Sequence, residues 1–162
     1  MALFMAQVIF MGIVATVVID IWAVILSTIF KLPTTNWSMV GRWCAHIRTG
    51  QFIHRPISQS KPVKYEQTIG WLFHYIIGIG YAYLYVMLMV FIIIKDPSLT
   101  SAIIYGLVTL IAPWLVLQPA LGLGLFARLA EKPNTIRALN LSVHLIFGVA
   151  LYFAWTLSLA LF

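Results

Sequence analysis

Four long apolar runs constrain this chain more than any other feature of its sequence. They cover residues 2–30, 67–94, 99–127 and 135–161. Each exceeds the roughly 20 residues that a helix needs to cross a hydrocarbon core about 30 Å thick. A bilayer offers backbone groups no water, so spanning segments of this length form helices rather than strands. The sequence therefore predicts an all-α, polytopic membrane protein, with four transmembrane helices in a single domain over residues 1–162.

The composition supports this class. Hydrophobic residues make up 62% of the chain and charged residues 9%, against roughly 45–50% and about 25% in soluble domains. So few charges cannot cover the surface of a soluble domain of this size. The single cysteine, Cys44, excludes a disulfide scaffold. The net charge is +6, and the basic side chains lie between the apolar runs. We therefore expect contact with anionic lipid and no nucleic-acid partner.

The basic residues predict the topology. Nine of the ten Lys and Arg side chains lie in the connections 31–66 and 128–137, and the tenth, Lys95, lies between the second and third runs. The positive-inside rule places both connections in the cytoplasm and both termini in the periplasm. No basic residue precedes Lys31, so the first run lacks the positive region of a cleavable signal peptide and is expected to remain as a helix.

The connection 31–66 contains an amphipathic pattern. Thr35 or Asn36 can cap a short helix whose apolar residues recur at helical spacing. The pattern predicts a helix at headgroup level, anchored by Trp37, Arg42 and Trp43 against anionic lipid. The alternative is a metal or partner site built from three residues of the same connection: Cys44, His46 and His54.

Two short motifs suggest an internal repeat. His74 and His144 are each followed by a glycine four residues later, Gly78 and Gly148. Glycine-initiated segments begin at Gly12 and at 106 in the first and third runs. These matches predict a tandem two-helix repeat in parallel orientation, and chance resemblance is the alternative.

Four polar side chains lie within the apolar runs, one in each: Asp20, His74, Gln118 and His144. At about 1.5 Å per residue they lie roughly 10–16 Å from the cytoplasmic boundary. Polar groups in lipid turn inward and find partners. The sequence therefore predicts an intramembrane polar cluster of these four residues at the centre of the bundle.

The third run also contains two prolines, Pro113 and Pro119. Each removes a backbone donor and releases the carbonyl four residues earlier, at Thr109 and Leu115. We expect a kinked or partly unwound helix whose freed carbonyls can bind an ion or substrate.

Several functions compete for the cluster. Ion- or proton-linked transport is the leading hypothesis, with Asp20 as the proton or cation site and His74 and His144 exchanging protons with it. A metal held by Asp20, His74 and His144, or a haem held by the two histidines, is an alternative. The others are a structural role and a non-catalytic subunit or assembly factor, with a homo-oligomer or a membrane-protein partner expected. An enzyme is least favoured, because the sequence has no nucleophile, HExxH or phosphate-loop motif.

The sequence also resembles a known family. The resemblance rests on five segments in chain order: Gly12 to Trp22, Val40 to Trp43, Gly70 to Tyr75, Gln118-Pro119, and His144 to Tyr152. These segments are similar to those of a bacterial family of small inner-membrane proteins catalogued as domain of unknown function 2938. The resemblance implies a Gram-negative inner-membrane protein with four helices. It implies no activity and no catalytic residue.

Overall fold

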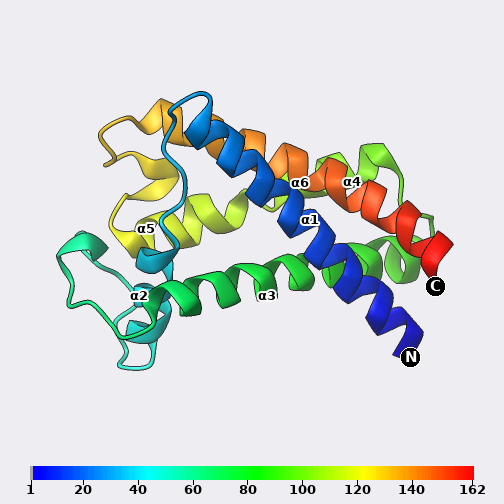
Figure 1. The fold of residues 1–162 in the computed structure, drawn as a ribbon, viewed down its shortest axis with the longest axis horizontal. Coiled ribbons are helices and arrows are strands. Elements are labelled where there is room, and N and C mark those ends of the chain that lie inside the picture. The colour runs from blue at the N-terminus through cyan, green and yellow to red at the C-terminus, as the bar shows by residue number, and fades with distance from the viewer. Residues whose placement is uncertain (1) are drawn as a thin grey trace. The chain divides into compact units, whose positions relative to one another are not determined.

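The computed structural model describes residues 2–162, which are largely helical and include no β-strand. Figure 1 labels the helices, and its colours follow the chain from the N-terminus to the C-terminus. Their bounds are α1 Ala2–Thr28, α2 Trp37–Ile47, α3 Glu66–Val86, α4 Leu99–Val108, α5 Gln118–Leu121 and α6 Pro133–Leu161. Two π-helices, Met87–Ile93 and Pro113–Leu117, continue α3 and precede α5, and short 3₁₀ turns cover Ile57–Gln59 and Leu125–Ala127.

Four helical stretches are long and apolar enough to cross a membrane, as predicted: Ala2–Thr28, Glu66–Ile93, Leu99–Leu121 and Pro133–Leu161. Only 22–33% of each apolar window is buried inside the protein, so most of each helix surface is available to lipid. The third stretch ends at Leu121, earlier than the expected residue 127. The reason is Gly122, whose φ of 90° forms a left-handed cap that ends the helix.

Contacts divide the chain into two compact units. The first comprises Met1–Pro33, Tyr75–Thr109 and Ser142–Phe162. Side chains from α1, α3, α4 and α6 share its apolar core: Val8, Met11, Ala15, Ala82, Tyr85, Val86, Met89, Ala102, Phe147, Ala150, Leu151 and Ala154. Its four helices are therefore held together by one continuous set of buried side chains.

Glycines bring the helices of the first unit into close contact. A Cβ at Gly12 of α1 would overlap the backbone of Ile79 in α3, and one at Gly106 of α4 would lie 2.5 Å from the His144 carbonyl oxygen of α6. Gly148 faces the α4 backbone in the same way. Small residues of this kind let membrane helices approach closely. Both helix pairs thus pack through glycine, a parallel consistent with the tandem repeat, which stays a prediction.

The second unit comprises Thr34–His74 and Leu110–Leu141. The expected short helix, α2, begins where the Asn36 side chain accepts a hydrogen bond from the Met39 backbone at 3.2 Å. Trp43, Ile57 and Ala120 form the buried core of this unit. The core therefore joins α2 and the connection after it to α5.

Candidate functional site

Asp20, the acidic residue of the first span, pairs with a tyrosine. The Tyr75 hydroxyl donates to Asp20 Oδ2 at 2.8 Å, and both side chains are half-buried. The pair joins α1 to α3 next to the glycine contact between these helices, where Thr16 fills the space beside Gly78. A carboxylate within a spanning segment is thus held by a protein hydroxyl, the pairing expected for a polar group in lipid.

His144 pairs with a threonine instead. Its Nδ1 lies 2.7 Å from Thr109 Oγ1, and the same hydroxyl lies 2.5 Å from the Gly106 carbonyl oxygen. The hydroxyl has one proton, which the carbonyl requires because it can only accept. The hydroxyl therefore accepts from Nδ1–H of His144. A neutral His144 then presents Nε2 as an unprotonated nitrogen.

A third hydrogen bond in the first unit sets the orientation of α1 and α6. The Trp22 indole N–H donates to Ser142 Oγ at 3.1 Å. Residues two apart on a helix differ by about 200° in direction, so Trp22 and Asp20 lie on different faces of α1, and Ser142 and His144 lie on different faces of α6. No hydrogen bond joins Asp20 to His144 within residues 2–162. These two members of the predicted cluster have different partners.

His74 and Gln118 belong to the second unit. The His74 ring stacks on Trp37 with a centroid distance of 3.9 Å and meets Trp71 edge-on at 5.8 Å. Gln118 donates through Nε2 to Asn140 Oδ1, and its Oε1 is buried without a hydrogen-bond partner. The four predicted residues are divided between two units, so their meeting in one cluster stays a prediction.

Near the two prolines, the helix departs from α geometry. The π-helix Pro113–Leu117 precedes α5, and the backbone N–H of Gln118 bonds to the Pro113 carbonyl. π-Helical turns are frequent at functional sites. Gln118 is the first residue of α5, which ends at Leu121. It therefore lies closer to the end of the third span than expected from its separation from Arg128, the first basic residue after that span.

The cofactor alternatives gain no support from the geometry. No three His, Cys, Asp or Glu side chains within residues 2–162 are grouped to hold a metal ion, and the site of Asp20, His74 and His144 stays a sequence-based hypothesis. A haem beside the two histidines needs open space next to their glycines. That space is filled, because a Cβ at Gly78 would overlap Thr16 and one at Gly148 would lie 2.5 Å from the Ala102 carbonyl. These residues do not fit a haem.

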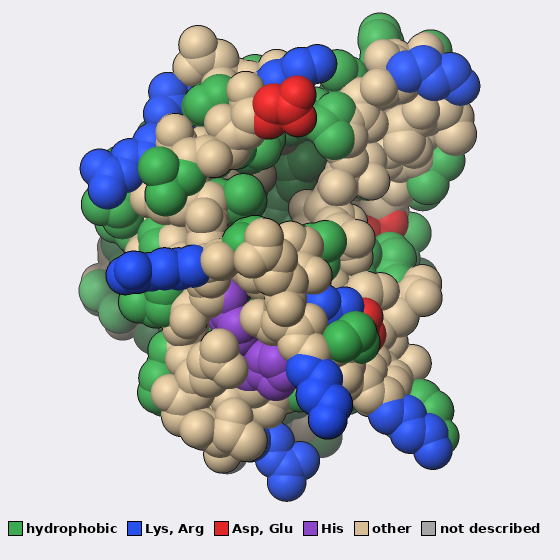
Figure 2. All heavy atoms as spheres, turned by 90° about the vertical axis from the view of Figure 1, so that its left-hand side faces the viewer, with side chains coloured by type: hydrophobic (Ala, Val, Ile, Leu, Met, Phe, Trp, Pro, Cys, Tyr) green, Lys and Arg blue, Asp and Glu red, His purple; other side chains and the backbone are tan. Residues whose placement is uncertain are grey.

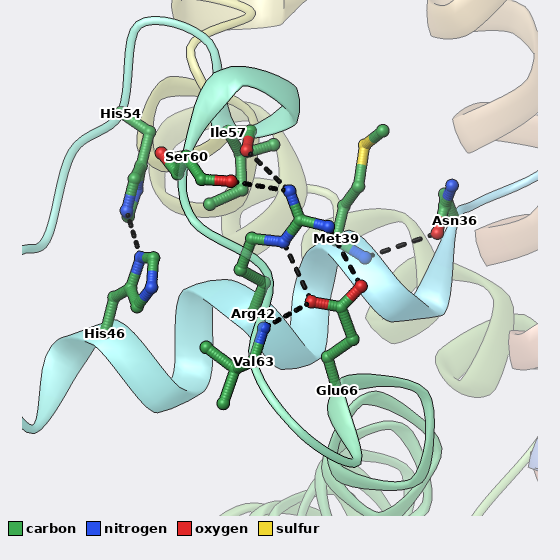
Figure 3. Close-up of polar contacts among 9 residues, drawn as sticks. All are labelled: Asn36, Met39, Arg42, His46, His54, Ile57, Ser60, Val63 and Glu66. Atoms are coloured by element: carbon green, nitrogen blue, oxygen red, sulfur yellow. Dashed lines mark hydrogen bonds and ion pairs between the residues drawn. The ribbon is translucent and has the colours of Figure 1, made fainter.

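The predicted anchor residues of α2 make internal contacts (Figure 3). Arg42 is buried, and its guanidinium forms an ion pair with Glu66. The hydrogen bonds that this guanidinium donates to the Glu66 carboxylate raise its pKa above the ordinary value. Trp43 is also buried, and its indole N–H donates to the Phe52 carbonyl at 3.0 Å. With Trp37 stacked on His74, the lipid contact expected of Arg42 and Trp43 is replaced by contacts inside the second unit.

Two histidines of the same connection face each other. His46 Nδ1 lies 2.9 Å from His54 Nε2, and His54 Nδ1 lies 3.3 Å from the Ala120 carbonyl oxygen (Figure 3). Because a carbonyl oxygen can only accept, a neutral His54 carries its proton on Nδ1 and accepts from His46 at Nε2. Cys44 is half-buried and is not grouped with the two histidines as a metal site in the described residues. The pair ties α2 to the connection and to α5.

Sequence reasoning missed the partners in these contacts: Glu66, Tyr75, Thr109, Asn140 and Ser142. None of them has a spacing that marks it as a partner. Only Tyr75, next to His74 within an apolar run, carried a signal, since a tyrosine hydroxyl in a span needs an acceptor.

The sequence matches a known protein family. The model of a family described as "Protein of unknown function (DUF2938)" matches residues 9–158. Comparisons with curated proteins and with solved structures found no match. Since the match covers nearly the whole chain, and with it most of each candidate span, this chain belongs to the family of proteins of unknown function DUF2938.

Proposed function

We propose that this protein supports ion- or proton-linked transport across a bacterial inner membrane, with Asp20 as the group that binds and releases a proton. The observation that carries the proposal is the hydrogen bond between the Tyr75 hydroxyl and the Asp20 carboxylate inside two spanning helices. Ionisable side chains in such segments are by default candidates for ion and proton pathways.

Protonation of Asp20 changes the contact between α1 and α3. An ionised carboxylate only accepts hydrogen bonds, so the Tyr75 hydroxyl donates to it. A protonated carboxyl group also donates, and the tyrosine hydroxyl then turns to accept or releases the bond. Proton binding at one side chain is thereby coupled to the packing of two spanning helices.

His144 offers a second place for a proton in the same unit. Its Nδ1–H is used by Thr109, so an incoming proton binds at Nε2 and leaves that hydrogen bond intact. The carboxylate of Asp20 and the imidazole of His144 thus offer two places for a proton in this unit, each with its own hydrogen-bond partner. In the proposal the two basic connections lie in the cytoplasm and both termini in the periplasm, and two copies of the chain form the working protein.

Proton and cation flux into proteoliposomes tests this function. The protein is expected to carry flux that empty liposomes lack, and Asp20→Asn, which keeps the shape of the side chain and removes its charge, is expected to abolish it. Tyr75→Phe should retain flux with a changed pH dependence. Asp96→Asn is the matched control, because Asp96 is exposed between the second and third spans. Flux through Asp20→Asn equal to that of the unaltered protein rejects the proposal, as does flux no greater than in empty liposomes.

A further inference from the structure

Large hydrophobic side chains are exposed in the two basic connections, outside the spanning helices. In the first connection Phe52 and Ile53 are 60% and 63% exposed. The second connection is preceded directly by the segment after the third span, which ends at Leu121. In this segment and the start of the connection, Leu125, Phe126 and Leu129 are 45%, 42% and 69% exposed. We call these two sets the apolar tips. Lipid contact by a span does not explain their exposure, because both sets lie beyond the span ends.

The backbone of both apolar tips is fixed by hydrogen bonds. The Phe52 carbonyl accepts from the Trp43 indole, and the Phe126 carbonyl accepts from Arg137 Nε at 2.8 Å. The Phe126 ring also packs on Trp114 with a centroid distance of 5.3 Å. The exposed side chains therefore project from well-held loops rather than from a frayed chain.

The two loops that carry the apolar tips lie side by side. The His54 backbone N–H, next to Ile53, donates to the Ala120 carbonyl at 2.9 Å, just before the second tip. Gly122 packs so closely on the same loop that a Cβ there would lie 2.7 Å from the His54 carbonyl oxygen. The loops that carry the tips are thus in direct backbone contact.

Positive charge surrounds these side chains. Arg48 and Arg55 flank the first tip, and Arg128 and Lys132 lie within or beside the second, all of them exposed. The second unit has eight Lys and Arg, of which Arg42 pairs with Glu66; seven remain against the single further acid, Glu131. Figure 2 shows Lys and Arg side chains over the face it presents, with hydrophobic side chains between them and few acidic ones.

We infer that the two apolar tips enter the headgroup layer of an anionic bilayer together, while the basic side chains around them bind lipid phosphates. Apolar side chains with a basic surround are the pattern of surfaces that lie in the bilayer interface. Each Lys or Arg near an anionic surface adds attraction that falls off within a Debye length. The partner is thus the charged surface of the protein's own membrane.

The full-length chain in lipid nanodiscs, which leave both membrane faces open to solution, allows a direct test. In a Cys44→Ser background, Ile53→Cys or Leu129→Cys carries an environment-sensitive fluorophore. Gln59→Cys, an exposed polar position in the same connection, is the matched control. In nanodiscs of equal parts phosphatidylcholine and phosphatidylglycerol, labels at 53 and 129 are expected to emit at shorter wavelength and to resist iodide quenching. The label at 59 is expected to behave as in water.

The charge dependence separates this inference from simple apolar contact. Phosphatidylcholine alone, or replacement of Arg48, Arg55, Arg128 and Lys132 by Gln, should return the labels at 53 and 129 toward the control. Raising the salt from about 0.1 M to about 1 M should do the same, since the Debye length falls from about 10 Å to about 3 Å.

Three results overturn the inference. They are iodide quenching at 53 and 129 equal to that at 59, equal protection with and without the anionic lipid, and self-quenching between labels that reveals a second copy of the chain over the tips. The Asp20→Asn variant should insert its tips normally, so the outcome is independent of the transport proposal.

Discussion

Arg42 and Glu66 are joined by two parallel hydrogen bonds, 2.8 Å from Nε to Oε2 and 2.9 Å from Nη2 to Oε1. The remaining Nη1 donates to the carbonyl oxygens of Ile57 and Ser60. One guanidinium thus fixes α2, the 3₁₀ turn of the connection and the first residue of α3. The forked geometry is specific to arginine, because an ammonium group cannot make two parallel bonds to a carboxylate.

Arg42→Lys is therefore expected to lower the free energy of unfolding by about 2 kcal/mol, since the partly buried carboxylate and the carbonyls lose part of their donors. Unfolding in a denaturing detergent, followed by circular dichroism, measures the effect. Arg48→Lys is the control, because Arg48 is exposed at the end of the same helix. An Arg42→Lys protein as stable as this control would contradict the structural role of the fork.

Gly70→Ala is expected to prevent the native packing of α2 on α3. A Cβ at Gly70 would overlap the Trp37 carbonyl oxygen, a backbone atom that cannot move aside. Gly80→Ala, in the same helix, meets no atom within 4 Å and should be neutral or stabilising by up to about 1 kcal/mol. The two variants are compared by their yield of folded protein and by their unfolding in detergent. Equal yield and equal stability would contradict the close approach of Gly70 to the Trp37 carbonyl.

Thr109→Val should destabilise the first unit by about 1–2 kcal/mol, because it leaves the Nδ1–H of His144 without an acceptor at unchanged side-chain volume. Thr109→Ser restores the hydroxyl and most of the stability. Thr156→Val is the control, as Thr156 is exposed on α6. Denaturing-detergent titrations rank the three proteins; a Val variant as stable as the Ser variant argues against the hydrogen bond.

Cys44 is expected to react slowly with iodoacetamide near neutral pH. Burial raises the pKa of its thiol, so less thiolate is present at a given pH and the rate should rise only at more alkaline pH than for an ordinary cysteine. The comparison is Thr49→Cys in a Cys44→Ser background, since position 49 is exposed just beyond α2. Mass spectrometry gives the reaction rate of each cysteine from neutral to alkaline pH. The two curves of rate against pH should have the same shape, with the curve for Cys44 shifted to higher pH. Identical profiles would show a solvated thiol.

The four spans could be predicted from the sequence, because length and apolar content alone decide whether a helix can cross a bilayer. The end of the third span could not. Leu123, Leu125 and Phe126 continue the apolar run past Gly122, and hydropathy does not report the left-handed backbone at that glycine. The short helix after Pro33 was found because its capping residue and its apolar spacing agree.

The candidate site was predictable only in part. Polar residues within spans could be expected to find partners, but the choice of Tyr75 for Asp20 depends on how far each helix is rotated. Close packing at Gly12 and Gly78 determines that rotation, and sequence spacing does not encode it. Arg42 was assigned to lipid because an amphipathic pattern places every cation on the polar face. Its actual partner, Glu66, is 24 residues away.

Two hydrogen bonds hold α1 from nearly opposite sides, one to Tyr75 of α3 and the other to Ser142 of α6. A rotation of α1 about its long axis that lengthens one bond also displaces the donor of the other. If a change at Asp20 weakens the bond to Tyr75, the bond from Trp22 to Ser142 still ties α1 to α6.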